Sequence, residues 1–134
     1  MQQSAAIQKL SNDFCNIFAE AHKAEQHKLS LVAGPGYRKA LEFLIKDYVI
    51  ALKPDDKDKI EKMMLGNCLA TYVEDDKIKQ TAKRAAWLGN DETHCVRKWE
   101  DKDVNDLKKL ISLTRHWIEM EQLTKDFLQD MPEP

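Results

Sequence analysis

The stretch YRKALEFLIKDYVIAL, from Tyr37 to Leu52, decides the fold of this chain. Its apolar side chains recur every three or four residues, which is the spacing of one face of an α-helix. They are Tyr37, Leu41, Leu44, Ile45, Tyr48, Val49 and Leu52, with Phe43 and Ile50 adding apolar area beside them. Because this is the most apolar helix in the chain, we expect it to occupy the centre of a helical bundle.

Helical spacing extends upstream of this segment. Apolar side chains from Ile7 to Ala21 step by three and four and predict a helix running from Ser4 to about His27. Residues 29–33 have the same character, but Gly34-Pro35-Gly36 follows them. Pro35 either begins a new helix at its first turn or kinks a continuous one, and both possibilities stay open at this point.

Downstream of the central segment, the pattern predicts further helices and one loop. A helix through Ile60 is expected to be capped by Asp55 or Asp56 and to end at Gly66-Asn67. The other expected elements are a short helix from Cys68 to Val73, an Ala-rich helix from Ile78 to about Asp91, a loop around Trp99 and a last helix from Val104 to about Leu128.

We therefore expect a single all-α domain over residues 1–134, built as a bundle of about five to six helices. The ordered bundle is expected to cover residues 4–128. Residues 129–134, which include Pro132 and Pro134, are expected to form a tail. Sustained alternation with a period of two, which would indicate strands, does not occur in the sequence.

Composition limits the classes of function. A chain of 134 residues is the size of one ordinary domain, and a formal net charge of −2 gives the whole molecule no electrostatic attraction to nucleic acid. The three cysteines lack the Cys-x-x-Cys spacing of a zinc site, so no metal or other cofactor is expected. Because no apolar stretch reaches the roughly 20 residues of a membrane span and no signal peptide is found, we expect a soluble, cytoplasmic protein.

The stretch RAAWLGNDETHCVRKWEDKD, from Arg84 to Asp103, carries the candidate site. His94 follows Asn90 by four residues, so the two side chains share a helix face, about 6 Å apart along the axis. A histidine can donate or accept a proton near neutral pH, and an asparagine can orient a phosphate or the imidazole ring. Equally, Gly89 and Asn90 can end a helix whose last carbonyl groups meet His94. A functional pair and a helix terminus remain alternatives.

Aromatic and basic side chains accompany this pair in the sequence. Such a surface can stack single-stranded bases, although tryptophans in these positions more often cover the end of a bundle. The side chains concerned are Trp87, Trp99 and Trp117 with Arg97, Lys98 and Arg115.

An arginine could complete the candidate site by lying beside His94. Arg38 and Arg97 are both open as that partner, whereas Arg84 lies about 15 Å from His94 along one helix. We expect Asn90 and His94 to lie near the same region of a second subunit, in a cleft bordered by Trp87, Arg97 and Trp99.

Two stretches together resemble a known bacterial family. They are GYRKALEFLIKDYVI, Gly36–Ile50, and IKQTAKRAAWLGNDETHCVRKWEDKDVNDLKKLISLTRHWI, Ile78–Ile118. The most specific pieces are Arg38–Glu42 and Leu88–His94. The resemblance, which spans roughly Asp13 to Leu123, is to the family DUF4145, a domain of unknown function often found near or fused to restriction and other defence enzymes.

That family in turn looks like the HEPN group of helical bundles, many of which are metal-independent ribonucleases working as dimers. Their signature is an arginine, a polar residue that is often asparagine, three further residues and a histidine. Asn90 and His94 match the last two positions, but Gly89 stands where the arginine belongs. The resemblance thus implies a HEPN-like scaffold whose motif is incomplete.

Two functions follow from this resemblance. The first is a non-catalytic, HEPN-like interaction or regulatory module that binds a protein or nucleic-acid partner in a prokaryotic defence or stress-response system. The second is a metal-independent ribonuclease in which His94 works with a displaced arginine, with Arg38, Arg84 or Arg97 arriving across a dimer. Gly89 favours the first, because the charge that develops on a phosphorane needs a cation. A symmetric homodimer is also implied, and the three tryptophans beside a strongly apolar helix agree with it.

Overall fold

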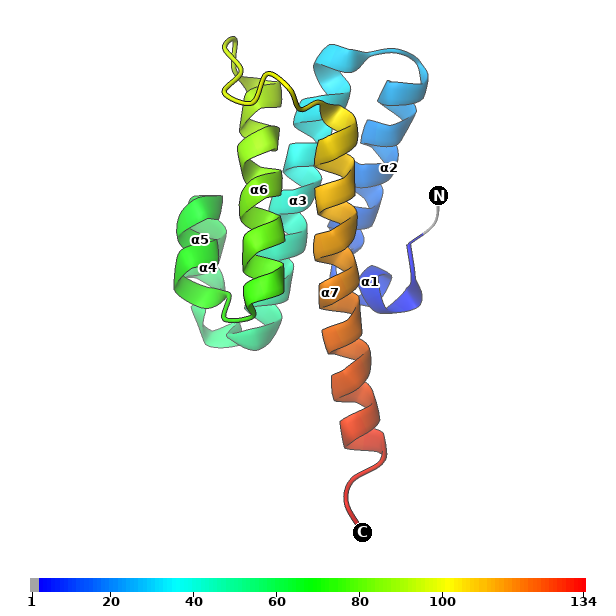
Figure 1. Ribbon diagram of the computed structural model, residues 1–134. Coiled ribbons are helices and arrows are strands. Elements are labelled where there is room, and N and C mark those ends of the chain that lie inside the picture. Colours follow the sequence, from blue (N-terminus) through cyan, green and yellow to red (C-terminus); the bar gives the residue numbers. More distant parts are fainter. Residues whose placement is uncertain (1–2) are drawn as a thin grey trace.

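The computed structural model describes residues 3–134, and this part of the chain contains seven α-helices, one 3-10 turn and no strand (Figure 1). The prediction of an all-α bundle is confirmed. In chain order the elements are α1 (Ala5–Leu10), α2 (Asn12–Gln26), α3 (Ser30–Leu52), η1 (Pro54–Asp56), α4 (Lys57–Lys62), α5 (Leu65–Tyr72), α6 (Asp76–Thr93) and α7 (Val104–Asp130).

Helix α3 lies at the centre, as its apolar pattern predicts. It contacts every other helix, and Tyr37, Leu41, Leu44, Ile45 and Val49 are completely buried. The long helices α2, α3, α6 and α7 run antiparallel to their neighbours in the chain, while α4 packs on α3 and α5 packs on both α3 and α6 (Figure 1). Helix α7 packs chiefly on α6 and also touches α3. The α2–α3 turn and the α6–α7 loop therefore lie at the same end of the bundle.

The expected continuous helix from Ser4 to His27 is wrong, because Ser11 divides it into α1 and α2. The backbone of Ser11 is not helical, and its hydroxyl oxygen accepts a hydrogen bond from the amide of Phe14 at 3.2 Å. The same hydroxyl donates to the carboxylate of Asp47 on α3 at 2.5 Å. Since Ser11 is buried, these two bonds satisfy it and also cap α2.

Pro35 lies inside a continuous helix, which decides between the two possibilities that the sequence leaves open. Its missing N–H costs α3 one backbone hydrogen bond. The glycines beside it bring α3 close to its neighbours. A Cβ on Gly36 would lie 3.0 Å from the Cβ of Ala21 on α2, and one on Gly34 would lie 2.8 Å from the Cβ of Glu92 on α6.

Two expected helix ends are also wrong. Gly66 and Asn67 do not end a helix but begin α5, because the chain leaves α4 at Met63, where the backbone is extended. This early break lets both Ile60 and Leu65 enter the core from two short helices. Helix α7 continues to Asp130, so residues 129 and 130 belong to it rather than to the tail. Within residues 3–134, no helix is long and apolar enough to cross a membrane.

Candidate functional site

The loop between α6 and α7, residues 94–103, is held in place by one buried carboxylate. Asp91, on the last turn of α6, is only 4 % exposed. Its two oxygens accept hydrogen bonds from the backbone amides of Lys98 at 3.0 Å and Trp99 at 2.9 Å. Burial of the carboxyl group opposes its ionisation, but these amides and the nearby cations outweigh it and lower the pKa of Asp91. The charged carboxylate therefore fixes the loop against α6.

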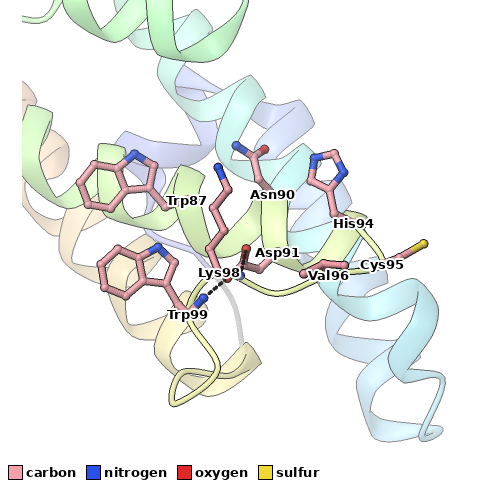
Figure 2. A pocket seen from close by; sticks show the side chains of 8 residues that line it. All are labelled: Trp87, Asn90, Asp91, His94, Cys95, Val96, Lys98 and Trp99. Atoms are coloured by element: carbon pink, nitrogen blue, oxygen red, sulfur yellow. Dashed lines mark hydrogen bonds between the residues drawn. The ribbon is translucent and has the colours of Figure 1, made fainter.

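An open cleft of about 810 Å³ lies between this loop and α6 (Figure 2). Trp87 and Trp99 form one wall, where their rings stack with centroids 5.9 Å apart and planes 7° apart. Each ring is about two-fifths exposed. Val96 and Lys98 complete the lining on the loop side, and Lys98 is the one permanently charged cation among the lining residues. The cleft is mostly apolar and aromatic.

Asn90 and His94 lie together in this cleft, as the sequence predicts. Their side chains project on the same side of the end of α6 (Figure 2). His94 is the first residue beyond the helix, with an extended backbone, and its amide donates to the carbonyl oxygen of Asn90 at 3.1 Å. The backbone of His94 thus ends the helix while its exposed imidazole faces the cleft, so the two alternatives are not exclusive.

Arg38 on α3 is the arginine that the structure brings to Asn90. Its Nε donates to Oδ1 of Asn90 at 3.3 Å, across 52 positions of sequence. Its Nη1 is engaged with Glu42, which also accepts from Lys46 at 2.8 Å. Burial would raise the pKa of Glu42, but the bonds with Lys46 and Arg38 lower it. The guanidinium is therefore partly neutralised by a carboxylate that stays ionised.

A second hollow, of about 650 Å³, lies on the other side of Asn90 and His94. Arg38 and Lys83 supply its basic groups, and residues 64–67 at the start of α5 close it. Asn90 and His94 thus line two open depressions, of which the second has more basic groups.

An arginine, which the HEPN signature has at this point, would not fit at position 89, where the chain has a glycine. The residue is buried and faces α3, where an added Cβ would lie 2.4 Å from Cγ and 2.9 Å from Cβ of Arg38. Any larger side chain at position 89 would be directed into the contact between α3 and α6 rather than into the cleft. The glycine allows the close approach by which Arg38 reaches Asn90.

The other two candidate arginines lie elsewhere. Arg97 does not border the cleft as expected, because its guanidinium pairs with Glu92, whose side chain is buried against Gly34. Arg84 is exposed on the side of α6 next to α7, where its guanidinium carbon is 5.4 Å from the centroid of Trp87 and its Nη1 donates to the Gln80 side chain at 2.8 Å. The structure therefore joins Trp87, Asn90, His94 and Trp99 in one cleft, with Arg38 behind Asn90.

The role of Asp91 was not predicted from the sequence, where this residue is only the approximate end of the Ala-rich helix. A signal was present, since Asp91 continues the series Ala82, Ala85, Leu88 with a spacing of three, and an acid in a buried series needs partners. The identity of those partners, two amides of the following loop, is not encoded in the spacing.

Comparisons with protein-family models, with curated proteins and with solved structures found no match to this chain. The resemblance to DUF4145 and the HEPN group therefore stays a prediction. No group of three or more His, Cys, Asp or Glu side chains within residues 3–134 is arranged to hold a metal ion.

Proposed function

We propose that this chain is a non-catalytic, HEPN-like interaction module that holds a protein partner in the cleft beside His94. One observation carries the proposal: the cleft is open, aromatic and mainly apolar, with a few polar groups at its edge. Such a lining can bury an apolar side chain of a partner while Asn90 and His94 bond its polar groups.

Charge favours a protein over a nucleic acid as that partner. Binding of a nucleic-acid backbone draws on several cations that are free to neutralise phosphates. Lys98 is the one permanent cation of the cleft itself. Of the two cations in the adjoining hollow, Arg38 is engaged with Glu42, which leaves Lys83. The formal net charge of −2 adds no general attraction.

A metal-independent ribonuclease is the second candidate, and one contact favours it. Arg38 places a guanidinium beside Asn90, the neighbour of His94, as a displaced motif arginine must. Against it stands Glu42, which binds that guanidinium and reduces the charge available to a phosphorane. The link to a prokaryotic defence or stress-response system rests on the sequence resemblance of Arg38–Glu42 and Leu88–His94.

The test compares His94→Ala with His27→Ala, since both histidines are exposed and both end a helix, but only His94 lines the cleft. In a pull-down, the proteins that bind to the wild type but not to His94→Ala are identified. They are then purified, and their affinity for each of the two variants is measured by titration. We expect His94→Ala to weaken binding at least tenfold and His27→Ala to bind as the wild type does. Each change should alter the free energy of unfolding by no more than about 0.5 kcal/mol.

Cys95 gives an independent readout, because it is exposed in the cleft while Cys68 is buried and Cys15 is half-buried. A bound partner should slow alkylation of Cys95. Cleavage of RNA in EDTA by the wild type, lost with His94→Ala, would overturn the proposal in favour of the ribonuclease. If His94→Ala instead destabilises the fold and binding falls only in proportion to the folded fraction, the role of His94 is that of a helix cap.

A further inference from the structure

Helix α7 extends well beyond the bundle that its first half covers. Its 27 residues span about 40 Å. The buried residues of α7 are Leu107, Ile111, Thr114 and Ile118, and every residue from Leu123 onwards is exposed. Figure 1 shows the last turns of α7 projecting past the other helices. The last eight residues of the helix, 123–130, are therefore all exposed, whereas Glu121 still bonds to Tyr48 of α3.

One face of α7 carries an exposed apolar row along most of its length. Leu113, Met120 and Phe127 are seven residues apart, or about two turns each, so they lie one behind another. Leu128 and Met131 continue the row on the projecting turns, and all five side chains are about half exposed or more. A row with this spacing is the kind of seam that a second helix covers.

At its N-terminal end, the row runs into a groove of about 370 Å³ between α6 and α7. Both rings of the Trp87–Trp99 stack line this groove together with Leu110, whereas Asn90 and His94 do not line it. Its charged rim is basic, with three cations and one acid: Arg84, Lys102, Lys109 and Asp106.

The projecting end of α7 has the opposite charge. Residues 123–133 contain three acids and one base, namely Asp126, Asp130 and Glu133 against Lys125. The two ends of the same face are thus complementary, an aromatic groove with a basic rim at one end and an apolar segment with acids at the other.

We propose that a second copy of this chain packs antiparallel along α7, so that each projecting end fills the groove of the other copy. With the twofold axis beside Met120, Leu113 faces Phe127 of the partner copy and Lys109 lies near Asp130 of that copy. The interface is closed, since both copies use the same face, and both apolar rows are covered. The exposed row lies on a different face of α7 from the buried residues Leu107, Ile111 and Ile118, so each bundle lies on the side of its own α7 that the partner copy does not use.

Self-complementarity selects a second copy over a different partner. A helix of another protein could cover the apolar row. The groove and the acidic end, however, lie at equal distances from Met120 on one helix, which is the arrangement that a twofold axis at Met120 requires. Ten or eleven residues separate Met120 from Leu110 and Lys109 on one side and from Asp130 and Met131 on the other. The antiparallel register aligns these groups without adjustment.

This dimer differs from the one expected from the HEPN resemblance. There, the Asn90–His94 regions of two subunits lie together, whereas here they lie at opposite ends. Sixteen residues of helix separate Val104 from Met120, or about 24 Å on each side of the axis, so the two Cys95 loops are roughly 50 Å apart. Each cleft then lies far from the other and can bind a partner separately. The proposed dimer does not depend on that binding role.

The oligomeric state tests the proposal. Light scattering behind size exclusion, over roughly 1 to 100 μM, should give a dimer for the wild type and a monomer for Phe127→Glu. Leu31→Glu is the matched control, because Leu31 is an almost fully exposed apolar side chain on α3, away from this face; it should remain a dimer. Helix content by circular dichroism should be the same for all three proteins, so that a monomer cannot be attributed to unfolding.

Two further measurements test the register. Lys109→Glu and Asp130→Lys should each weaken the dimer at least tenfold, and the double variant should regain most of the loss. Spin labels on Cys95, in a Cys15→Ala background, should give a separation of roughly 50 Å in the dimer. A monomeric wild type at 100 μM, a dimer that survives Phe127→Glu, or two labels within about 25 Å would each overturn the proposal. Binding at the His94 cleft, followed through Cys95 alkylation, should survive in Phe127→Glu and keeps the two proposals separate.

Discussion

A single ionised side chain, Asp91, connects the end of α6 to the shape of the cleft. Its carboxylate accepts hydrogen bonds from the consecutive amides of Lys98 and Trp99, and the Trp99 ring is thereby set against Trp87. Hydrogen bonds that amides donate to a charged carboxylate are stronger than bonds between neutral groups, because the negative charge lies on the accepting oxygens. At the scale of the residue, the cleft exists because one acid is buried and satisfied.

Asp91→Asn tests this role with an almost unchanged volume. One amide of the loop would then meet the NH₂ of the new side chain instead of an acceptor, and we expect the free energy of unfolding to fall by about 1 to 3 kcal/mol. Chemical denaturation at pH 7 measures it. Asp101→Asn, in the same loop but largely exposed, is the control and should have an effect within about 0.5 kcal/mol. Equal effects of the two changes would contradict the role given to Asp91.

The same acid predicts a pH dependence. Because the pKa of Asp91 is lowered in the folded protein, its contribution to stability is complete above the unfolded value of about 3.9 and is lost as the pH falls through the lower folded value. The difference in melting temperature between the wild type and Asp91→Asn should therefore be constant from pH 7 to about 5 and should shrink below about pH 4. A difference that disappears between pH 7 and 5 would point to another group.

At the scale of the element, glycines inside helices set how closely α3 and α6 approach. Gly89 faces Arg38, and Gly34 faces Glu92, so the same pair of helices is in close contact at two places. This approach brings Arg38 to Asn90 and also buries the Glu92 side chain that Arg97 pairs with. Two of the arginines that the sequence offers to His94 are thereby assigned to other contacts.

Gly89→Ala and Gly66→Ala form a matched pair of helical glycines. A Cβ at position 89 would overlap Arg38, and we expect a loss of about 1 to 3 kcal/mol. A Cβ at position 66 meets nothing within 4 Å, so the change should stabilise α5 by about 0.5 to 1 kcal/mol. Urea denaturation gives both values. If both substitutions changed the free energy of unfolding in the same direction, the contact with Arg38 would not be what distinguishes the two positions.

Gly89→Arg extends this test to function. An arginine at position 89 would complete the residue types of the HEPN motif, but its side chain would point toward α3. We expect it to destabilise the fold and to produce no cleavage of RNA in EDTA. Cleavage acquired by this variant and lost again with His94→Ala would show that position 89 reaches the cleft after all.

At the scale of the whole molecule, the helices share one core. Buried side chains of α2, α3, α6 and α7 form a single cluster, and α3 contacts all the other helices. Nothing in this arrangement lets the end that carries the cleft unfold separately from the rest. A domain of this size with one core is expected to unfold in a single transition.

The tryptophans make that expectation measurable. In a Trp117→Phe background, the near-ultraviolet circular dichroism of the tryptophans reports Trp87 and Trp99 at the cleft, whereas the far-ultraviolet signal reports all the helices. The two thermal transitions should coincide within about 2 °C, because both follow the same global unfolding. An earlier loss of the near-ultraviolet signal would mean that the loop opens on its own, and that the cleft is not held as firmly as its hydrogen bonds indicate.

The sequence by itself determined the features that depend on local spacing. The central position of α3 follows from its apolar period, and the starts of α6 and α7 follow from Asp75 and Asp103, each of which caps amides two or three residues away. The clustering of Trp87, Asn90 and His94 was also predictable, since these residues occupy neighbouring turns of one helix end.

Only the tertiary structure decided the features that depend on partners far away in the chain. Ser11 breaks a helix because Asp47 on α3 holds its hydroxyl, and Arg38 rather than Arg97 meets Asn90 because Gly89 lets two helices approach. Pro35 remains inside α3, where glycines on either side fit against Ala21 and Glu92. Spacing along one helix shows which residues share a face, but the distance between two helices depends on the side chains of both.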